Sequence, residues 1–206
     1  MGYEFQNFEE ALNSALGADE GERRDGPRFL TVYRVARVFT GSDLGLVRVV
    51  NISNHGLMIA TKLELGLGTE VTVDLSEKCS LTGQVVWARP GHCGIKLKAP
   101  IDCRALLARL RRDLRMPGEW PLRLTLDRRV VCSTELGVQI IRLRDISQRG
   151  AKIVHDGRFR AGLKVKLHLT ERIECRGVIR WAQDGLAGLQ FEKELSVPEL
   201  GSIKHL

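Results

Sequence analysis

Cysteine pairs and long apolar runs are missing from this sequence. The five cysteines are odd in number and form no C-x-x-C pair, so neither a disulfide framework nor a zinc site is expected. We therefore expect a reducing compartment. No apolar run approaches the roughly 18 residues needed to cross a bilayer, and the first residues are acidic where a signal peptide would be basic. We therefore expect a cytoplasmic protein that does not insert into a membrane.

Recognisable catalytic patterns are also missing. The sequence has no Ser/His/Asp ordering on suitable elements, no metal-ligand spacing and no phosphate-cradling glycine loop. The spacing of four of its histidines suggests neither a metal site nor a triad: His55, His92, His155 and His168. A protein that is not an enzyme and needs no metal or cofactor is expected.

Aromatic residues make up only 5% of the chain, whereas basic residues are in excess. A small-barrel nucleic-acid binder needs exposed aromatics interleaved with basic residues, so DNA and RNA are not expected as partners. The 32 Lys+Arg against 25 Asp+Glu give a net charge of +7. Since arginine suits phosphate and guanine, a small anionic partner is one interpretation; a charge that serves only solubility is the other.

An internal repeat sets the domain organisation. The 206 residues suit two domains of about 100 residues each. A gapless shift of 94 residues aligns positions 51–100 with 145–194, with 13 identities in 50. Many of these identities are glycines, and one is the pair Trp87/Trp181, so turn geometry and a large side chain repeat in register. The sequence is a duplication.

Each copy has the pattern of a small β-barrel. Segments such as V-T-V-D-L and V-K-L-H-L alternate apolar and polar residues, and turn residues separate them at spacings near 8 to 12. About six short strands per copy favour an antiparallel barrel, since closure removes exposed edges. Trp87 and Trp181, inside apolar strands, are expected in the cores.

Helices are predicted only outside the barrels. Residues 101–115 begin with Asp102 as a candidate N-cap and place Leu106, Leu107, Leu110 and Leu114 on one face. This helix should pack on a barrel; lying on a membrane is the alternative. A weaker helix is predicted over 3–15. The expected divisions are an N-terminal helix and lead (1–21), a first barrel (22–100), a connecting helix (101–117) and a second barrel with a C-terminal tail (118–206).

Two polar motifs of the first half should meet on the folded chain. Arg24 and Arg28 precede the first strand, and N-I-S-N-H-G (51–56) follows 23 residues later. Asn51 and Ser53 are expected to point to the same face of a strand, and Gly56 allows a positive φ or a close approach of a ligand to the backbone. R-x-x-x-R followed by D/N-x-S-x-x-G resembles the PilZ family, and the resemblance extends over nearly the whole chain. It implies an all-β fold with flanking helices: two tandem six-stranded antiparallel barrels of the split-barrel type.

The resemblance further implies binding of the second messenger cyclic diguanylate. Arg24 and Arg28 would clamp the ligand, since a guanidinium pairs with phosphate and with O6/N7 of guanine. Asn51 would offer an amide to a guanine edge, Ser53 a hydroxyl, and Gly56 room for the ligand. Binding would order the N-terminal lead and change the geometry between the domains, with a downstream protein partner receiving the signal.

The second copy keeps D-x-S-x-x-G but not the arginine pair. Its candidate residues are Arg123, Asp145, Ser147 and Gly150. Glu119 stands where the first arginine should be, and a carboxylate there would repel phosphate; Arg128 and Arg129 are possible substitutes. We expect the first barrel to bind and the second to serve as packing partner or output surface, with the converse left open.

Two interpretations without a ligand stand beside this hypothesis. Asn, Ser and Gly are ordinary turn formers, and arginines before a strand are often a solvated linker. A ligand-free tandem adaptor that acts through protein contacts is therefore the alternative function.

Overall fold

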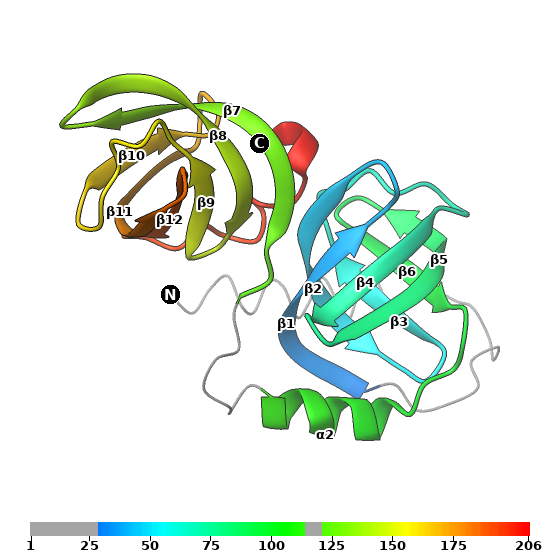
Figure 1. The fold of residues 1–206 in the computed structure, drawn as a ribbon. Helices are drawn as coiled ribbons and strands as arrows, with labels where there is room; N and C mark the ends of the chain where they lie inside the picture. Colours follow the sequence, from blue (N-terminus) through cyan, green and yellow to red (C-terminus); the bar gives the residue numbers. More distant parts are fainter. Residues whose placement is uncertain (1–28, 114–120) are drawn as a thin grey trace, which may run out of the picture.

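The computed structural model describes residues 29–113 and 121–206, with side chains described from Arg34 onward except that of Asp113. It forms two closed barrels of six antiparallel strands (Figure 1). The first has the strand order β1-β2-β3-β6-β5-β4, and the second has the equivalent order β7-β8-β9-β12-β11-β10. The predicted fold class is confirmed.

The twelve strands repeat in the same positions along the two halves. The first barrel contains β1 (Phe29–Phe39), β2 (Leu44–Ile52), β3 (Gly56–Ala60), β4 (Glu70–Ser76), β5 (Cys79–Arg89) and β6 (His92–Leu97). The second contains β7 (Leu124–Thr134), β8 (Gly137–Ser147), β9 (Gly150–Val154), β10 (Lys164–His168), β11 (Glu174–Gln183) and β12 (Leu186–Phe191). A short 3-10 helix, η1 (Ile203–His205), lies near the C-terminus.

The connecting helix α2 (Cys103–Asp113) closes one end of the first barrel (Figure 1). Asp102 caps it, since its Oδ1 accepts from Ala105 N at 2.9 Å, as predicted. Leu106 and Leu110 are buried in the first barrel's core, so the helix packs on the barrel with its leucines, as expected. Leu114, the predicted helix over 3–15 and the rest of the predicted N-terminal lead (1–21) lie outside the described residues. Among the residues described, no helix is long and apolar enough to span a bilayer.

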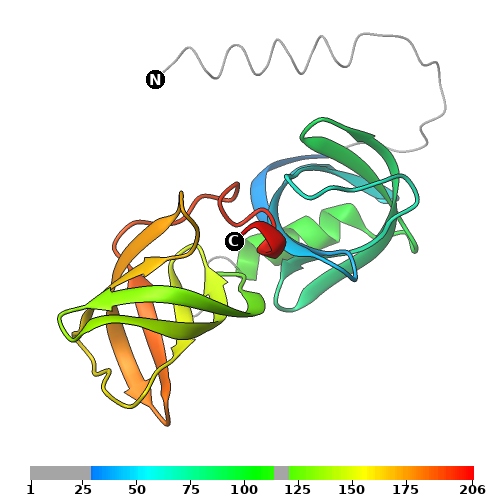
Figure 2. The same ribbon diagram turned by 90° about the horizontal axis from the view of Figure 1, so that it is seen from above.

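The two barrels are joined by the segment that follows the second one. Residues 195–206, here called the C-terminal segment, run between the barrels and contact both (Figure 2). Leu46 of β2 donates its N–H to Leu200 O at 2.8 Å, and its side chain, 1% exposed, lies in the apolar cluster of the second barrel. Ser202 Oγ donates to Asp43 Oδ2 at 2.6 Å. The barrels therefore form one docked unit.

All five cysteines are free and buried. Burial raises the pKa of Cys93 and of Cys132 to about 11, and burial, followed by the charges of Glu199 and Glu174, raises that of Cys175 to about 12. The thiolate is the reactive form, and these three cysteines hold almost none of it at pH 8. We expect a thiol reagent such as dithionitrobenzoate to react with the folded chain slowly at pH 8 and quickly once urea unfolds it. Rapid labelling of all five thiols under native conditions would contradict this burial.

Candidate ligand site on the outer face of the barrels

Asn51 lies on the outer face near the end of β2. Its neighbours along the β1–β2–β3 ladder are Leu30 on one side and Met58 on the other. Ile52, the next residue, is buried in the core, so Asn51 points outward and is half-buried. Strand alternation predicted that Asn51 and Ser53 share a face of one strand, but β2 ends at Ile52 and Ser53 lies in the turn that follows.

A tryptophan lies in the same row of outward residues. Met58 is opposite Gly94, and Gly94 is opposite Trp87. A Cβ on Gly94 would collide with the indole ring, so the ring lies flat over this glycine. In the second barrel Trp181 covers Gly188 in the same way and is 44% exposed. The prediction that both tryptophans belong to the cores was wrong: a bulge before each one turns it to the outer face.

The motif serine is engaged within its own turn. Ser53 Oγ donates to Gly56 O at 3.1 Å, and Ser53 N donates to the same oxygen at 2.8 Å. Ser147 Oγ repeats the bond to Gly150 O at 3.2 Å. The conserved pattern of the two copies therefore closes the β2–β3 and β8–β9 turns, which agrees with the turn interpretation. Ser53 Oγ keeps its acceptor capacity, whereas Ser147 Oγ already accepts from Arg149 N at 3.4 Å.

The motif glycine is required by the neighbouring strand. Gly56 does not adopt a positive φ, so this part of the expectation was wrong. A Cβ on Gly56 would lie 2.6 Å from the Ile95 carbonyl oxygen, and one on Gly150 would lie even closer to Leu189 O. The close approach at this glycine is thus made by a β-strand of the same barrel, whereas the prediction had a ligand there.

Asn54, within the motif, ties the turn to helix α2. Its Oδ1 accepts from Cys103 N at 3.2 Å, and its main-chain oxygen accepts from Ile101 N at 2.8 Å. Sequence analysis did not single out Asn54, because the motif leaves this position open. A movement of the turn would act directly on the start of the helix.

Arg24 and Arg28 lie outside the described residues. The described part of β1 begins at Phe29, whose partner in β2 is Ile52, and Leu30 lies opposite Asn51. The described chain therefore begins beside the motif, at the residue that follows Arg28 in the sequence.

In the second barrel, Arg123 and Asp145 are brought together. Arg123 Nε donates to Asp145 Oδ1 at 2.5 Å, and Lys152 Nζ lies 3.5 Å from Oδ2. Lys152 occupies the position of Met58, opposite Asp145, and was missed by sequence analysis although the repeat aligns the two. Arg129 instead lies opposite Arg142 on the far part of β7, and Glu119 is outside the described residues.

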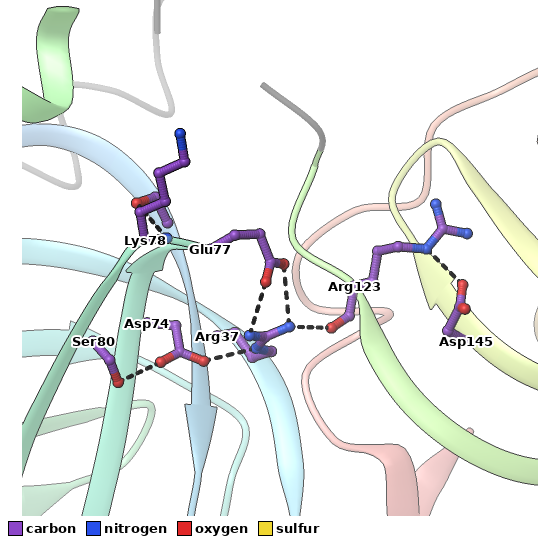
Figure 3. A network of polar contacts seen from close by, with 8 residues as sticks. Arg37, Asp74, Glu77, Lys78, Ser80, Arg123 and Asp145 are labelled. Carbon is purple, nitrogen blue, oxygen red and sulfur yellow. Dashed lines mark hydrogen bonds and ion pairs between the residues drawn. The ribbon is translucent and has the colours of Figure 1, made fainter. Parts of the chain in front are cut away.

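Arg37 links this site to the first barrel (Figure 3). Its Nη1 donates to the Arg123 carbonyl oxygen at 2.7 Å, while its Nε bonds Asp74 at 2.8 Å and its Nη1 also lies 3.3 Å from Glu77. The first barrel therefore holds the main chain of Arg123, while the side chain of Arg123 points the other way, to Asp145. Within the described residues, no group of three or more His, Cys, Asp or Glu side chains is placed to hold a metal.

Two closed barrels that carry the same polar turn at the same place define a class of tandem small-barrel proteins. The model of the PilZ domain matches residues 22–113 and again 109–206. The chain belongs to the PilZ domain family, and it contains two such domains.

Several solved structures are similar to this chain at low sequence identity and low TM-score. The Borreliella burgdorferi PlzA protein in complex with c-di-GMP has 11% identity and a TM-score of 0.37, over 83% of this chain and 90% of that one. The Bacillus subtilis inhibitor of motility MotI/DgrA has 17% identity and a TM-score of 0.31, over 81% and 91%. Escherichia coli YcgR in complex with c-di-GMP has 12% identity and a TM-score of 0.27, over 79% of this chain and 76% of that one. No curated protein sequence matches the chain.

Proposed function

We propose that this chain is a non-enzymatic signalling receptor that binds cyclic diguanylate on its first barrel. The observation that carries the proposal is the position of the polar turn relative to the start of β1. The polar turn that follows Asn51 lies at the point where β1 begins, one residue after Arg28. Membership of the PilZ family supports the choice of ligand.

Each residue has a role that its position allows. Arg24 and Arg28 supply planar cations for phosphate and for the Hoogsteen edge of guanine. Asn51 points outward with an amide that donates to a guanine edge, and Ser53 Oγ, whose proton goes to Gly56 O, accepts through its lone pairs. Gly56 fixes the turn rather than contacting the ligand. Ordering of the arginine lead on the barrel would then be the signal, passed on through the docked second barrel to a protein partner.

The second barrel presents a different electrostatic surface. Asp145 already has Arg123 and Lys152 as partners, so a ligand phosphate would compete with a carboxylate for both cations. We therefore assign the ligand to the first barrel. A ligand-free adaptor is the second candidate function, because both motif serines are satisfied within their own turns.

Titration calorimetry with cyclic diguanylate tests this proposal. We expect saturable binding by the wild-type chain and a loss of about 1–3 kcal/mol, roughly 5- to 150-fold, in Arg28→Ala, the range for one bidentate guanine contact. Arg112→Ala removes an equal charge from the exposed side of α2 and serves as the control. No heat at high micromolar ligand would favour the adaptor, and a loss in Asp145→Ala but not in Arg28→Ala would move the ligand to the second barrel.

A further inference from the structure

The β7–β8 hairpin carries three exposed aliphatic side chains on its outer face. Val131 of β7 lies opposite Ile140 of β8. Val138 precedes Ile140 by two residues and so points to the same face, which makes the three side chains one patch. Val138 is 72% exposed and Ile140 is 71% exposed. Figures 1 and 2 show this hairpin projecting from the side of the second barrel that faces away from the first. Adjacent exposed apolar side chains of this size often mark an interaction surface.

The duplication supplies an occupied version of the same face. At the shift of 94 residues, Val138 and Ile140 correspond to Leu44 and Leu46 of β2. Leu46 is 1% exposed, because the C-terminal segment and the second barrel cover it, and Leu44 packs against the same cluster. One copy of the face is thus a buried contact, whereas its counterpart is open among the described residues.

The same comparison holds for the main chain. Pairing between β8 and β9 begins at Arg142, so the stretch from Val138 to Ile141 pairs with β7 alone among the described strands. In the first barrel, the equivalent free edge is used: Leu46 N donates to Leu200 O. Since Leu46 and Ile140 hold the same register position opposite Arg37 and Val131, Ile140 N is the matching donor.

A second copy of this chain is a poor occupant. Its C-terminal segment already covers its own first barrel. The C-terminal segment also needs a glycine beneath it, because the Gly201 carbonyl fills the space that a Cβ on Gly45 would occupy. The second barrel has Gln139 at the position that corresponds to Gly45. Like charges would meet as well: Arg129 lies directly opposite Arg142, next to the patch.

These arginines indicate the charge of the partner. Asp127 bonds Arg142 and lies 3.7 Å from Arg144, so one carboxylate serves both of these cations. Arg158, which bonds Gln139 of β8, is paired with Asp156. We propose that the outer face and free edge of β8 dock a partner protein through an extended segment with alternating apolar residues flanked by Asp or Glu. Main-chain pairing would give affinity, and the arginines would select acidic flanks. This proposal does not depend on cyclic diguanylate.

A labelled synthetic peptide tests the docking surface with the full chain. The peptide alternates Val or Ile with Thr and has Asp and Glu at its ends; a second version has Lys at the same ends. Fluorescence anisotropy should show saturable binding of the acidic peptide, weakened about 10-fold or more by Ile140→Glu or by the lysine flanks. Val86→Glu, at an exposed valine on the first barrel, should leave binding unchanged. Urea unfolding checks that both variants keep the native fold.

Several results would overturn the proposal. They are equal binding by Ile140→Glu, equal binding of the lysine-flanked peptide, and absence of saturation at about millimolar peptide. A concentration-dependent dimer that Ile140→Glu abolishes in sedimentation would assign the face to a second copy instead. Binding that appears only after deletion of residues 2–21 would assign it to the chain's own N-terminal segment.

Discussion

Replacing Leu200 with alanine is expected to lower the free energy of unfolding by about 2–5 kcal/mol, the range for a fully buried leucine. Leu200 is fully buried in the apolar cluster that also contains Leu46 of the first barrel. The substitution keeps the main-chain bond from Leu46 N but leaves a cavity at the contact between the barrels. Urea unfolding followed by circular dichroism measures the loss.

The matched control for this prediction is Leu67→Ala. Leu67 is largely exposed, so its truncation should change the free energy of unfolding by less than about 0.5 kcal/mol. Small-angle scattering should also show a larger radius of gyration for Leu200→Ala if the barrels separate. A loss below about 1 kcal/mol with unchanged scattering would mean that the C-terminal segment does not hold the barrels together.

Gly150→Ala is expected to destabilise the second barrel by about 3 kcal/mol, at the upper end of overpacking effects. The new Cβ would collide with the Leu189 carbonyl oxygen, which belongs to the backbone of β12 and cannot rotate away. Differential scanning calorimetry measures the effect, since two barrels can unfold in separate transitions.

Gly66→Ala provides the comparison for the glycine prediction. Gly66 has no positive φ, and a Cβ there would meet only the Thr69 side chain at 3.7 Å. We expect it to be neutral or to stabilise by up to about 1 kcal/mol, because alanine restricts the unfolded chain. Equal transition temperatures for the two variants would show that the β9–β12 contact yields easily.

Local patterns predicted the repeated part of this fold well. Period-2 alternation and in-register glycines predicted two six-stranded barrels. Asp102 as N-cap, together with the leucines on one face, predicted the connecting helix. The glycines were informative because Gly56, Gly83 and Gly94 each lie under an atom of a neighbouring strand or ring. The same reasoning failed for Trp87, since alternation assumes an unbroken strand and a bulge between Val85 and Trp87 reverses the face.

Contacts between distant segments were beyond prediction from one sequence. Asp43 meets Ser202, and Arg37 meets the main chain of Arg123, yet neither pair has a local signal. Within the candidate site, strand alternation placed Asn51 and the repeat placed Asp145. Lys152 and Asn54 were missed because their roles depend on which strand or helix lies beside them. The proposed roles of Arg24 and Arg28 stay predictions.

The covering of Leu46 by Leu200 has a consequence for biosynthesis. Residues 195–206 leave the ribosome only after the whole second barrel has been translated, whereas the first barrel is complete much earlier. Because domains usually fold in the order of synthesis, the face of β2 that carries Leu44 and Leu46 stays exposed to solvent during translation of the second half. A nascent chain halted between the barrels would therefore expose that apolar face to chaperones. The face would become buried once the C-terminal segment had been synthesised.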